Sequence, residues 1–201
     1  MKKYLFSLRA LALGGLVAAF AAVPAQAATT SVDTSACSNP LLTQPFLSAK
    51  DSNWYTLLPG ETPGNFDGTG WTLTGGAKVV TTTLADGSTT SVLDLPSGSQ
   101  AASPTVCVTS DYPTARAMVQ DVAGAEGVFF YVSYAGTNTW NTPKNTGQVH
   151  GSGTAWTLAT PVNLQPFNAT GWQPMRVTLV PGGKTSDFRV YNVYLDPHAR
   201  L

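Results

Sequence analysis

The chain has 201 residues, of which 43% are hydrophobic and only 11% are charged, with 11 basic and 11 acidic side chains. Nucleic acids and anionic membranes select strongly basic surfaces, so this balance argues against either as the main partner. The length suits a single domain with a core of its own.

The first residues have the features of an export signal. Lys2, Lys3 and Arg9 accompany an apolar stretch that ends near Val23, and Ala25-Gln26-Ala27 is the small-x-small pattern that signal peptidases cut. We therefore expect a signal peptide over residues 1–27, a flexible lead-in over residues 28–36 and one domain over residues 37–201. An uncleaved anchor is the alternative, but the apolar stretch is short for a membrane span.

Cleavage at this site would change the charge and the location of the protein. Eight basic and 11 acidic residues would remain, for a net charge of about −3 at pH 7. We expect a secreted product with no membrane span.

Cys37 and Cys107 are the only cysteines in the sequence. In an exported chain they are expected to form a disulfide, which would close a loop of 70 residues and stabilise the fold by about 4 kcal/mol on the chain-entropy model. Metal ligation is the alternative, and no Cys-x-x-Cys pair or neighbouring histidine supports it.

The rest of the chain consists of short strands punctuated by turn residues, with no amphipathic helix of useful length. Strands are expected over residues 71–73, 78–84, 89–95, 105–109, 114–121, 128–134, 147–150, 155–158, 173–180 and 187–195. Asp86-Gly87 predicts a hairpin turn, Pro181-Gly182-Gly183-Lys184 predicts another between the last two strands, and residues 135–146 are expected to form a long exposed loop. This spacing predicts an all-β fold, an antiparallel β-sandwich or barrel.

Three segments resemble a known family. Residues 64–80 (GNFDGTGWTLTGGAKVV) resemble the opening of galactose-binding-domain-like jelly rolls, including carbohydrate-binding modules, with Asp67 where Glu is usual. Residues 91–104 (SVLDLPSGSQAASP) resemble the descent into a strand in those folds, and residues 188–197 (FRVYNVYLDP) resemble their final strand. The chain as a whole also resembles small secreted proteins of actinobacteria.

The resemblance implies a jelly-roll β-sandwich and a carbohydrate ligand. Members of this fold often hold a structural Ca²⁺ through carboxylates near the first and last strands, and here Asp67 and Asp196 are the candidates. Asn192 stands where an acid is common, which lowers the charge available to such a site. Trp71, after Gly70, is expected to be a core ring.

The strand at residues 128–134 (VFFYVSY) is apolar on both sides. If four strands pair with one another, a period of two places one set of rings and guanidinium groups on a single sheet face away from the core. This set consists of Arg116, Phe129, Tyr131, Trp172, Arg176, Arg189 and Tyr191.

Such a face has three readings. Flat rings can stack on the C–H face of a sugar while Arg donates to hydroxyls or to a carboxylate. Alternatively, the rings and guanidinium groups stack on each other or lie beneath residues 40–61, or the face is an oligomer interface.

The remaining tryptophans lie outside this set. Trp140 lies in the polar loop and could contact sugar at the rim of the sandwich or fold back onto the sheet. Trp156 is expected to begin a strand and face the core, and Trp54 and Tyr55 are expected to pack.

No catalytic arrangement is visible. Glycoside hydrolysis needs two carboxylates, but neither Glu61 nor Glu126, the only two glutamates, has an acidic neighbour in sequence. Aspartates could serve instead, and their spacing singles out no pair. His150 and His198 accompany no nucleophile turn such as G-x-S-x-G. We therefore predict a non-catalytic protein without a cofactor. It either binds extracellular or cell-wall carbohydrate or serves as a structural or protein-interaction domain of the secreted envelope.

Overall fold

The structure is a computed structural model that describes residues 32–109, 113–164 and 171–197. The predicted signal peptide (residues 1–27), the first part of the lead-in and His198 lie outside these residues. In the described ranges there are two short 3₁₀ helices, η1 (Leu47–Ala49) and η2 (Asn138–Trp140). No described helix has the length and apolar character needed to cross a membrane.

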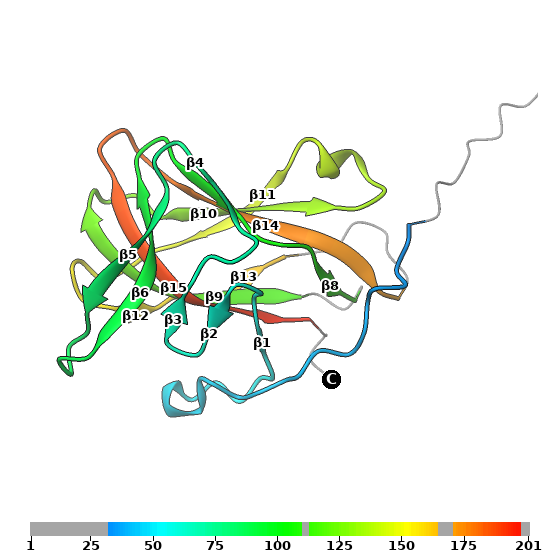
Figure 1. Ribbon diagram of the computed structural model, residues 1–201, viewed down its shortest axis with the longest axis horizontal. Coiled ribbons are helices and arrows are strands. Elements are labelled where there is room, and N and C mark those ends of the chain that lie inside the picture. Colours follow the sequence, from blue (N-terminus) through cyan, green and yellow to red (C-terminus); the bar gives the residue numbers. More distant parts are fainter. Residues whose placement is uncertain (1–31, 110–112, 165–170, 198–201) are drawn as a thin grey trace, which may run out of the picture. The chain divides into compact units, whose positions relative to one another are not determined.

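Two antiparallel sheets form the layers of the fold (Figure 1). The seven-stranded sheet has the order β12 (Thr157–Leu158), β9 (Thr114–Ala123), β15 (Asp187–Asp196), β6 (Thr89–Pro96) and β5 (Lys78–Thr83), with β1 (Thr56–Leu57) beside β15 and β13 (Val162–Asn163) beside β9. The six-stranded sheet has the order β11 (Lys144–Val149), β10 (Val128–Tyr134), β14 (Gln173–Pro181), β7 (Gln100–Ala102) and β4 (Thr72–Thr74), with β8 (Val106–Val108) beside β14. A separate pair consists of β2 (Glu61–Thr62) and β3 (Asn65–Phe66).

The core lies between the two sheets and follows the alternation of the strands. Val128, Phe130 and Val132 of β10 are fully buried, as are Val177 and Leu179 of β14. Each such side chain contributes about 1.5–3 kcal/mol by leaving water. The predicted all-β antiparallel sandwich is therefore confirmed.

Trp71 belongs to this core, as predicted. It is 8% exposed, packs edge-on against Phe66 at 5.0 Å between ring centroids, and donates its indole N–H to the Pro59 carbonyl at 2.7 Å.

The two predicted hairpins have different outcomes. At Asp86-Gly87 the chain turns as expected, since Leu84 donates to the Ser88 carbonyl at 2.8 Å and Gly87 has a φ of 83°. The second prediction is wrong, because β14 and β15 lie in opposite sheets. Gly182 donates instead to the Gly127 carbonyl at 2.8 Å, which attaches this connection to the beginning of β10. A Pro-Gly-Gly sequence reverses the chain equally well within a sheet and between sheets.

Other strand boundaries differ in a consistent way. β11 begins at Lys144, inside the segment expected to be a loop, and β1, β2, β3, β7 and β13 are additional strands. All five are two or three residues long, too short to show a period in the sequence.

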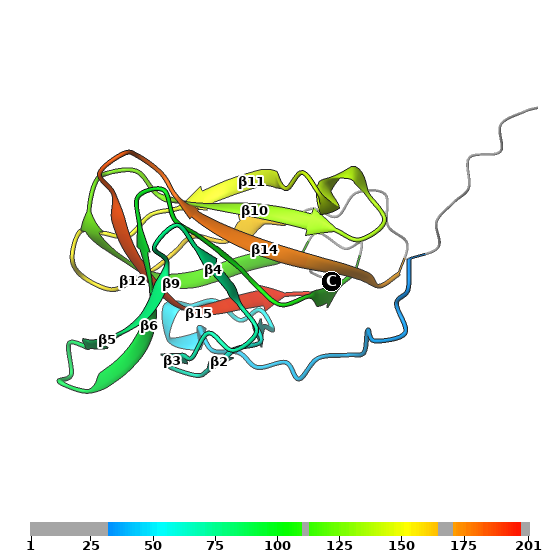
Figure 2. The ribbon, with the colours of Figure 1, turned by 45° about the horizontal axis from the view of Figure 1, so that its top comes forward.

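The N-terminal segment is tied to the sandwich and covers one of its faces. The predicted Cys37–Cys107 disulfide is present. Beyond it, the Thr43–Tyr55 bridge pairs the segment with itself, and β1 pairs with β15. Figures 1 and 2 both show this blue-to-cyan segment on the outer side of the seven-stranded sheet.

Candidate functional site

The residues predicted to share one sheet face belong to two sheets, so that prediction is wrong. β9 pairs with β15, which places Arg116, Arg189 and Tyr191 on the seven-stranded sheet. β10 pairs with β14, which places Phe129, Tyr131 and Arg176 on the six-stranded sheet. The two groups lie on opposite outer surfaces of the sandwich, since the core separates the sheets.

Arg116 lies beneath the N-terminal segment. Its Nη1 is 2.5 Å from Asp51 Oδ2, its Nε donates to the Ala159 carbonyl at 2.8 Å, and its Cζ lies 5.2 Å from the centroid of the Phe46 ring. Burial alone would raise the pKa of Asp51, but hydrogen bonds from Tyr55, the Asn53 N–H and Arg116 together lower it. Residues 46–55 therefore close over this part of the sheet, one of the readings that the sequence left open.

Arg189 and Tyr191 are also occupied within the fold. Arg189 Nε donates to Asp94 Oδ1 of the adjacent β6 at 3.3 Å. Tyr191 is only 7% exposed, and its ring meets that of Trp156 edge-on at 4.7 Å. Trp156 is half-buried, packs against the hydrophobic cluster that includes Tyr191, and lies immediately before β12 rather than within the strand that was expected to begin there. The seven-stranded sheet has little of the predicted aromatic and cationic surface left for a ligand.

The six-stranded sheet keeps the other part of the predicted set on its outer face. Ser133 lies opposite Arg176, Tyr131 opposite Thr178 and Phe129 opposite Val180. Phe129, Tyr131 and Arg176 are half-buried. The ring of Phe129 lies so close to the backbone at Gly182 that a Cβ added there would be 2.7 Å from it. Phe129 therefore packs against the connection that follows β14, whereas Tyr131 lies opposite Thr178 on the same face.

Two predicted tryptophans border this face. Trp172 precedes β14 and is half-buried. Trp140 ends η2, which is held by two threonines: Thr137 Oγ1 accepts the Thr139 N–H at 3.2 Å, and Thr139 Oγ1 accepts the buried Tyr134 N–H at 3.0 Å.

Trp140 and Arg176 make the central contact. The Arg176 Cζ lies 3.9 Å from the centroid of the Trp140 ring. A guanidinium over an indole face contributes about 0.5–2 kcal/mol, depending on its exposure. The contact holds Trp140 against the sheet, as one reading of the sequence had it.

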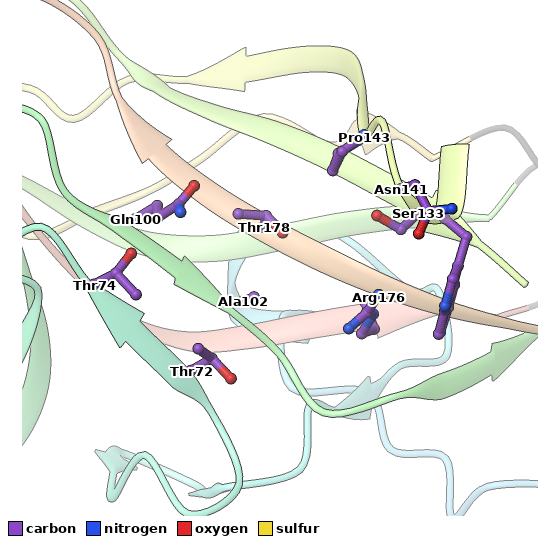
Figure 3. A pocket seen from close by; sticks show the side chains of 10 residues that line it. Thr72, Thr74, Gln100, Ala102, Ser133, Asn141, Pro143, Arg176 and Thr178 are labelled. Atoms are coloured by element: carbon purple, nitrogen blue, oxygen red, sulfur yellow. The ribbon is translucent and has the colours of Figure 1, made fainter. Parts of the chain in front are cut away.

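A hollow of about 220 Å³ lies beside this pair (Figure 3). Hydroxyl and amide side chains dominate its wall, together with one guanidinium and one indole. Its lining residues are Thr72, Thr74, Gln100, Ala102, Ser133, Trp140, Asn141, Pro143, Arg176 and Thr178. The side chains labelled in Figure 3 belong to β4, β7, β14 and β10 and to the loop that follows β10. No carboxylate is among the lining residues.

Most of this wall was not predicted. Thr72 and Thr74 flank the inward Leu73 on β4, and Thr178 follows Arg176 at a spacing of two on β14. That alternation is a signal in the sequence, but it singles out these threonines only when β4 is known to lie in the same sheet as β14.

Glu61 is a buried carboxylate outside the hollow. Both of its oxygens accept the Val193 N–H, at 3.2 and 3.1 Å, next to an irregularity of β15 where Asn192 has a φ of 53°. Burial raises the pKa of Glu61 well above its ordinary value, although hydrogen bonds from the backbone oppose the shift. These bonds attach β2 to β15, which gives Glu61 a structural role.

The metal candidates do not meet in one group with further ligands. Asp67 accepts the Thr69 N–H at 2.7 Å within its own turn, and Asp196 is buried at the end of β15. Across residues 32–197, apart from the two gaps, no three His, Cys, Asp or Glu side chains gather to hold a metal ion. The described side chains do not by themselves form the calcium site that the resemblance implies. Calcium binding therefore remains a prediction.

Comparisons with known proteins give structural neighbours only. No family model matches the chain, and no curated protein matches it. Similar solved structures include a family 6 carbohydrate-binding module from Clostridium cellulolyticum in complex with xylose, with a TM-score of 0.41 and 16% identity over 59% of this chain and 85% of that one. The CBM22-1 xylan-binding domain from Paenibacillus barcinonensis has a TM-score of 0.38 and 16% identity over 66% of this chain and 88% of that one.

A third neighbour is an enzyme, an arabinose-bound α-L-arabinofuranosidase with a TM-score of 0.44 and 14% identity over 73% of this chain and 27% of that one. Carbohydrate-binding modules, the domains that the sequence resembles, are thus among the structural neighbours of this chain. At these identities and TM-scores, the likeness carries no argument about what this chain binds.

Proposed function

We propose that this protein is a secreted, non-catalytic β-sandwich that binds carbohydrate in the hollow on the outer face of the six-stranded sheet. The single observation that carries the proposal is the composition of that hollow. It combines an aromatic side chain, Trp140, with a wall of hydroxyls and amides from Thr72, Thr74, Gln100 and Thr178. A sugar ring is complementary to this wall. Its apolar C–H faces can pack against an aromatic ring, and its rim of hydroxyls can bond to hydroxyls and amides.

The surroundings of the hollow support a preformed site. β4, β7, β14 and β10 are hydrogen-bonded neighbours, so the backbone under the lining residues is fixed before a ligand arrives. Side chains held on strands lose little freedom on binding, which favours affinity for a small polar ligand. Trp140 is restrained as well, by the threonine bonds of η2 and by Arg176.

Secretion is supported by the leader-like residues 1–27 and by the disulfide. Disulfides persist in oxidising compartments, which agrees with a product that acts outside the cytoplasm. The absence of a catalytic role is supported by the isolation of Glu61 and by the surroundings of His150, whose Nε2 lies 2.9 Å from the Gln148 amide. Neither residue lines the hollow.

Retention on insoluble polysaccharides and titration with soluble oligosaccharides test the proposal. We expect the purified protein to bind at least one glycan and Trp140→Ala to weaken that binding up to about tenfold, given ~0.5–1.5 kcal/mol for a ring contact. Thr178→Val, which replaces the hydroxyl by a methyl of similar shape, should also weaken it.

Trp54→Ala is the matched control, because Trp54 is 54% exposed in the segment that lies on the other sheet. This variant should bind as the wild type does. Failure of the wild type to bind any glycan, or equal losses in Trp54→Ala and Trp140→Ala, would contradict the proposal and favour a structural or protein-interaction role.

A further inference from the structure

Arg176 differs from the other arginines of the described strands in having no acidic partner. Arg116 pairs with Asp51 and Arg189 pairs with Asp94. Among the carboxylates that the structure describes, none lies within 4.0 Å of Arg176, whose recorded contact is the Trp140 ring. The positive charge of this half-buried guanidinium is therefore not balanced by any carboxylate of the described ranges.

The contact with Trp140 also leaves the donors of Arg176 available. A ring takes up the face of a guanidinium, whereas the N–H groups point outward in its plane and match two oxygens of an oxyanion. No residue of the described ranges accepts a hydrogen bond from Arg176. Trp140 thus holds the guanidinium of Arg176 in place, while the N–H groups of Arg176 donate to no residue of the described ranges.

The other groups around the hollow would tolerate a negative charge. Its lining contains no carboxylate that would repel an anion, and Ser133, opposite Arg176 across the strand pair, adds a hydroxyl that can donate. Further along, Thr178 on β14 and Thr72 and Thr74 on β4 extend the polar wall for more than the oxyanion alone. The hollow therefore has one cationic end and one neutral polar end.

We infer that the ligand of this hollow is an anionic sugar, in which a carboxylate or sulfate pairs with Arg176 while the sugar hydroxyls meet Thr72, Thr74, Gln100 and Thr178. This inference rests on the proposed carbohydrate-binding function and narrows it to one chemical class. The shared chemistry is a planar or tetrahedral oxyanion on a sugar ring, which can come from a uronic acid or from a sulfate ester.

Calorimetric titration with matched sugars tests the inference. One arm compares oligogalacturonides with their neutral methyl esters, and a second compares sulfated with desulfated galactan oligosaccharides. We expect the charged member of at least one pair to bind ten or more times more tightly than its neutral counterpart. That advantage should shrink as salt is raised, because exposed charges are screened.

Variants of the full chain locate the effect. Arg176→Gln should abolish the preference for the charged sugar, and Arg176→Lys should keep only part of it, because an ammonium offers no bidentate edge. Lys184→Gln removes an equal charge from the exposed connection between β14 and β15 and should leave the preference unchanged. Thermal unfolding of each variant checks that it is folded.

The outcomes separate the two claims. If charged and neutral sugars bind equally, the inference is overturned and the carbohydrate-binding function stands. If none of these sugars binds but the wild type is retained on another, neutral glycan, the inference alone is overturned. If the wild type binds no glycan in either experiment, both the inference and the carbohydrate-binding function fall. Preference for only one arm supports the inference and identifies carboxylate or sulfate as the source of the charge. Since the comparison of sugars uses the wild type, it holds even if a variant does not fold.

Discussion

The partly buried pair of Arg116 and Asp51 offers a quantitative test of how firmly the N-terminal segment is attached. The perturbation is Asp51→Ala, which removes the acceptor for Arg116, for the Tyr55 hydroxyl at 2.7 Å and for the Asn53 N–H at 3.0 Å. Arg116 would then remain under the segment with only the Ala159 carbonyl and the Phe46 ring as recorded partners.

The magnitude follows from the burial of the pair. The side chains of Arg116 and Asp51 are 12% and 10% exposed, so the pair is largely removed from water. Breaking a buried pair by removing one partner costs about 3–5 kcal/mol, most of which is the cost of the charge left behind. We take the lower end, about 3 kcal/mol, because water can reach the exposed tenth of each side chain. That loss lowers the melting temperature by about 6–12 °C for a domain of this size.

Denaturant unfolding followed by tryptophan fluorescence measures this loss, and a double-mutant cycle isolates the pair. Arg116→Met removes the charge but keeps an apolar stem, so the double variant with Asp51→Ala should lose less than the sum of the two single losses. Asp86→Ala is the matched control, since Asp86 accepts from Ser88 in an exposed turn and its removal should change stability far less.

Two results would refute this reasoning. A loss below about 1 kcal/mol for Asp51→Ala would put the pair in the range of solvated surface ion pairs. Strict additivity in the cycle would show that the two side chains do not stabilise each other across the segment.

Three further predictions concern other attachments. Cys37→Ser/Cys107→Ser should lower the free energy of unfolding by about 4 kcal/mol, the chain-entropy value for a loop of this length, as measured in denaturant; an unchanged midpoint would be inconsistent with that account. Because the pKa of Glu61 is raised in the fold, the folded state holds its proton more tightly, and stability falls as the pH rises above 4.5 toward the raised pKa. The stability of Glu61→Gln relative to the wild type should therefore increase over that pH range, and a flat difference in pH-dependent melting would rule this out. Asn192→Ala should destabilise more than Asn192→Gly in the same melting assay, because Asn192 has a φ of 53° and both variants lose the bond from the Gly64 N–H equally; the reverse order would show that backbone conformation is not the deciding factor.

The sequence predicted the strands well where the core imposes a pattern. β10 has the bounds that VFFYVSY indicated, because burial of alternate residues leaves a period of two that is readable without a structure. Trp71 and the disulfide were also predictable, since a glycine-flanked ring and two cysteines in an exported chain each favour one arrangement.

The composition of the site could not be predicted in the same way. Period two tells which residues share a side of one strand, but it does not tell which strand lies next to it. Arg176 and Arg189 each alternate outward, yet β14 and β15 belong to different sheets, so the two side chains end up on opposite surfaces. β7, which contributes Gln100 and Ala102 to the wall, has only three residues and is therefore too short to show a hydrophobic period.

The passage of the chain from β14 directly into β15 has a consequence for motion. β14 is a central strand of one layer and β15 of the other, and only residues 182–186 separate them. Separation of one sheet from the other would displace an inner strand of each. The amide hydrogens of both sheets should therefore exchange with solvent through one shared opening event. A sugar bound to Arg176 on β14 should then slow deuterium uptake in β15 as well, although the sugar makes no contact with β15.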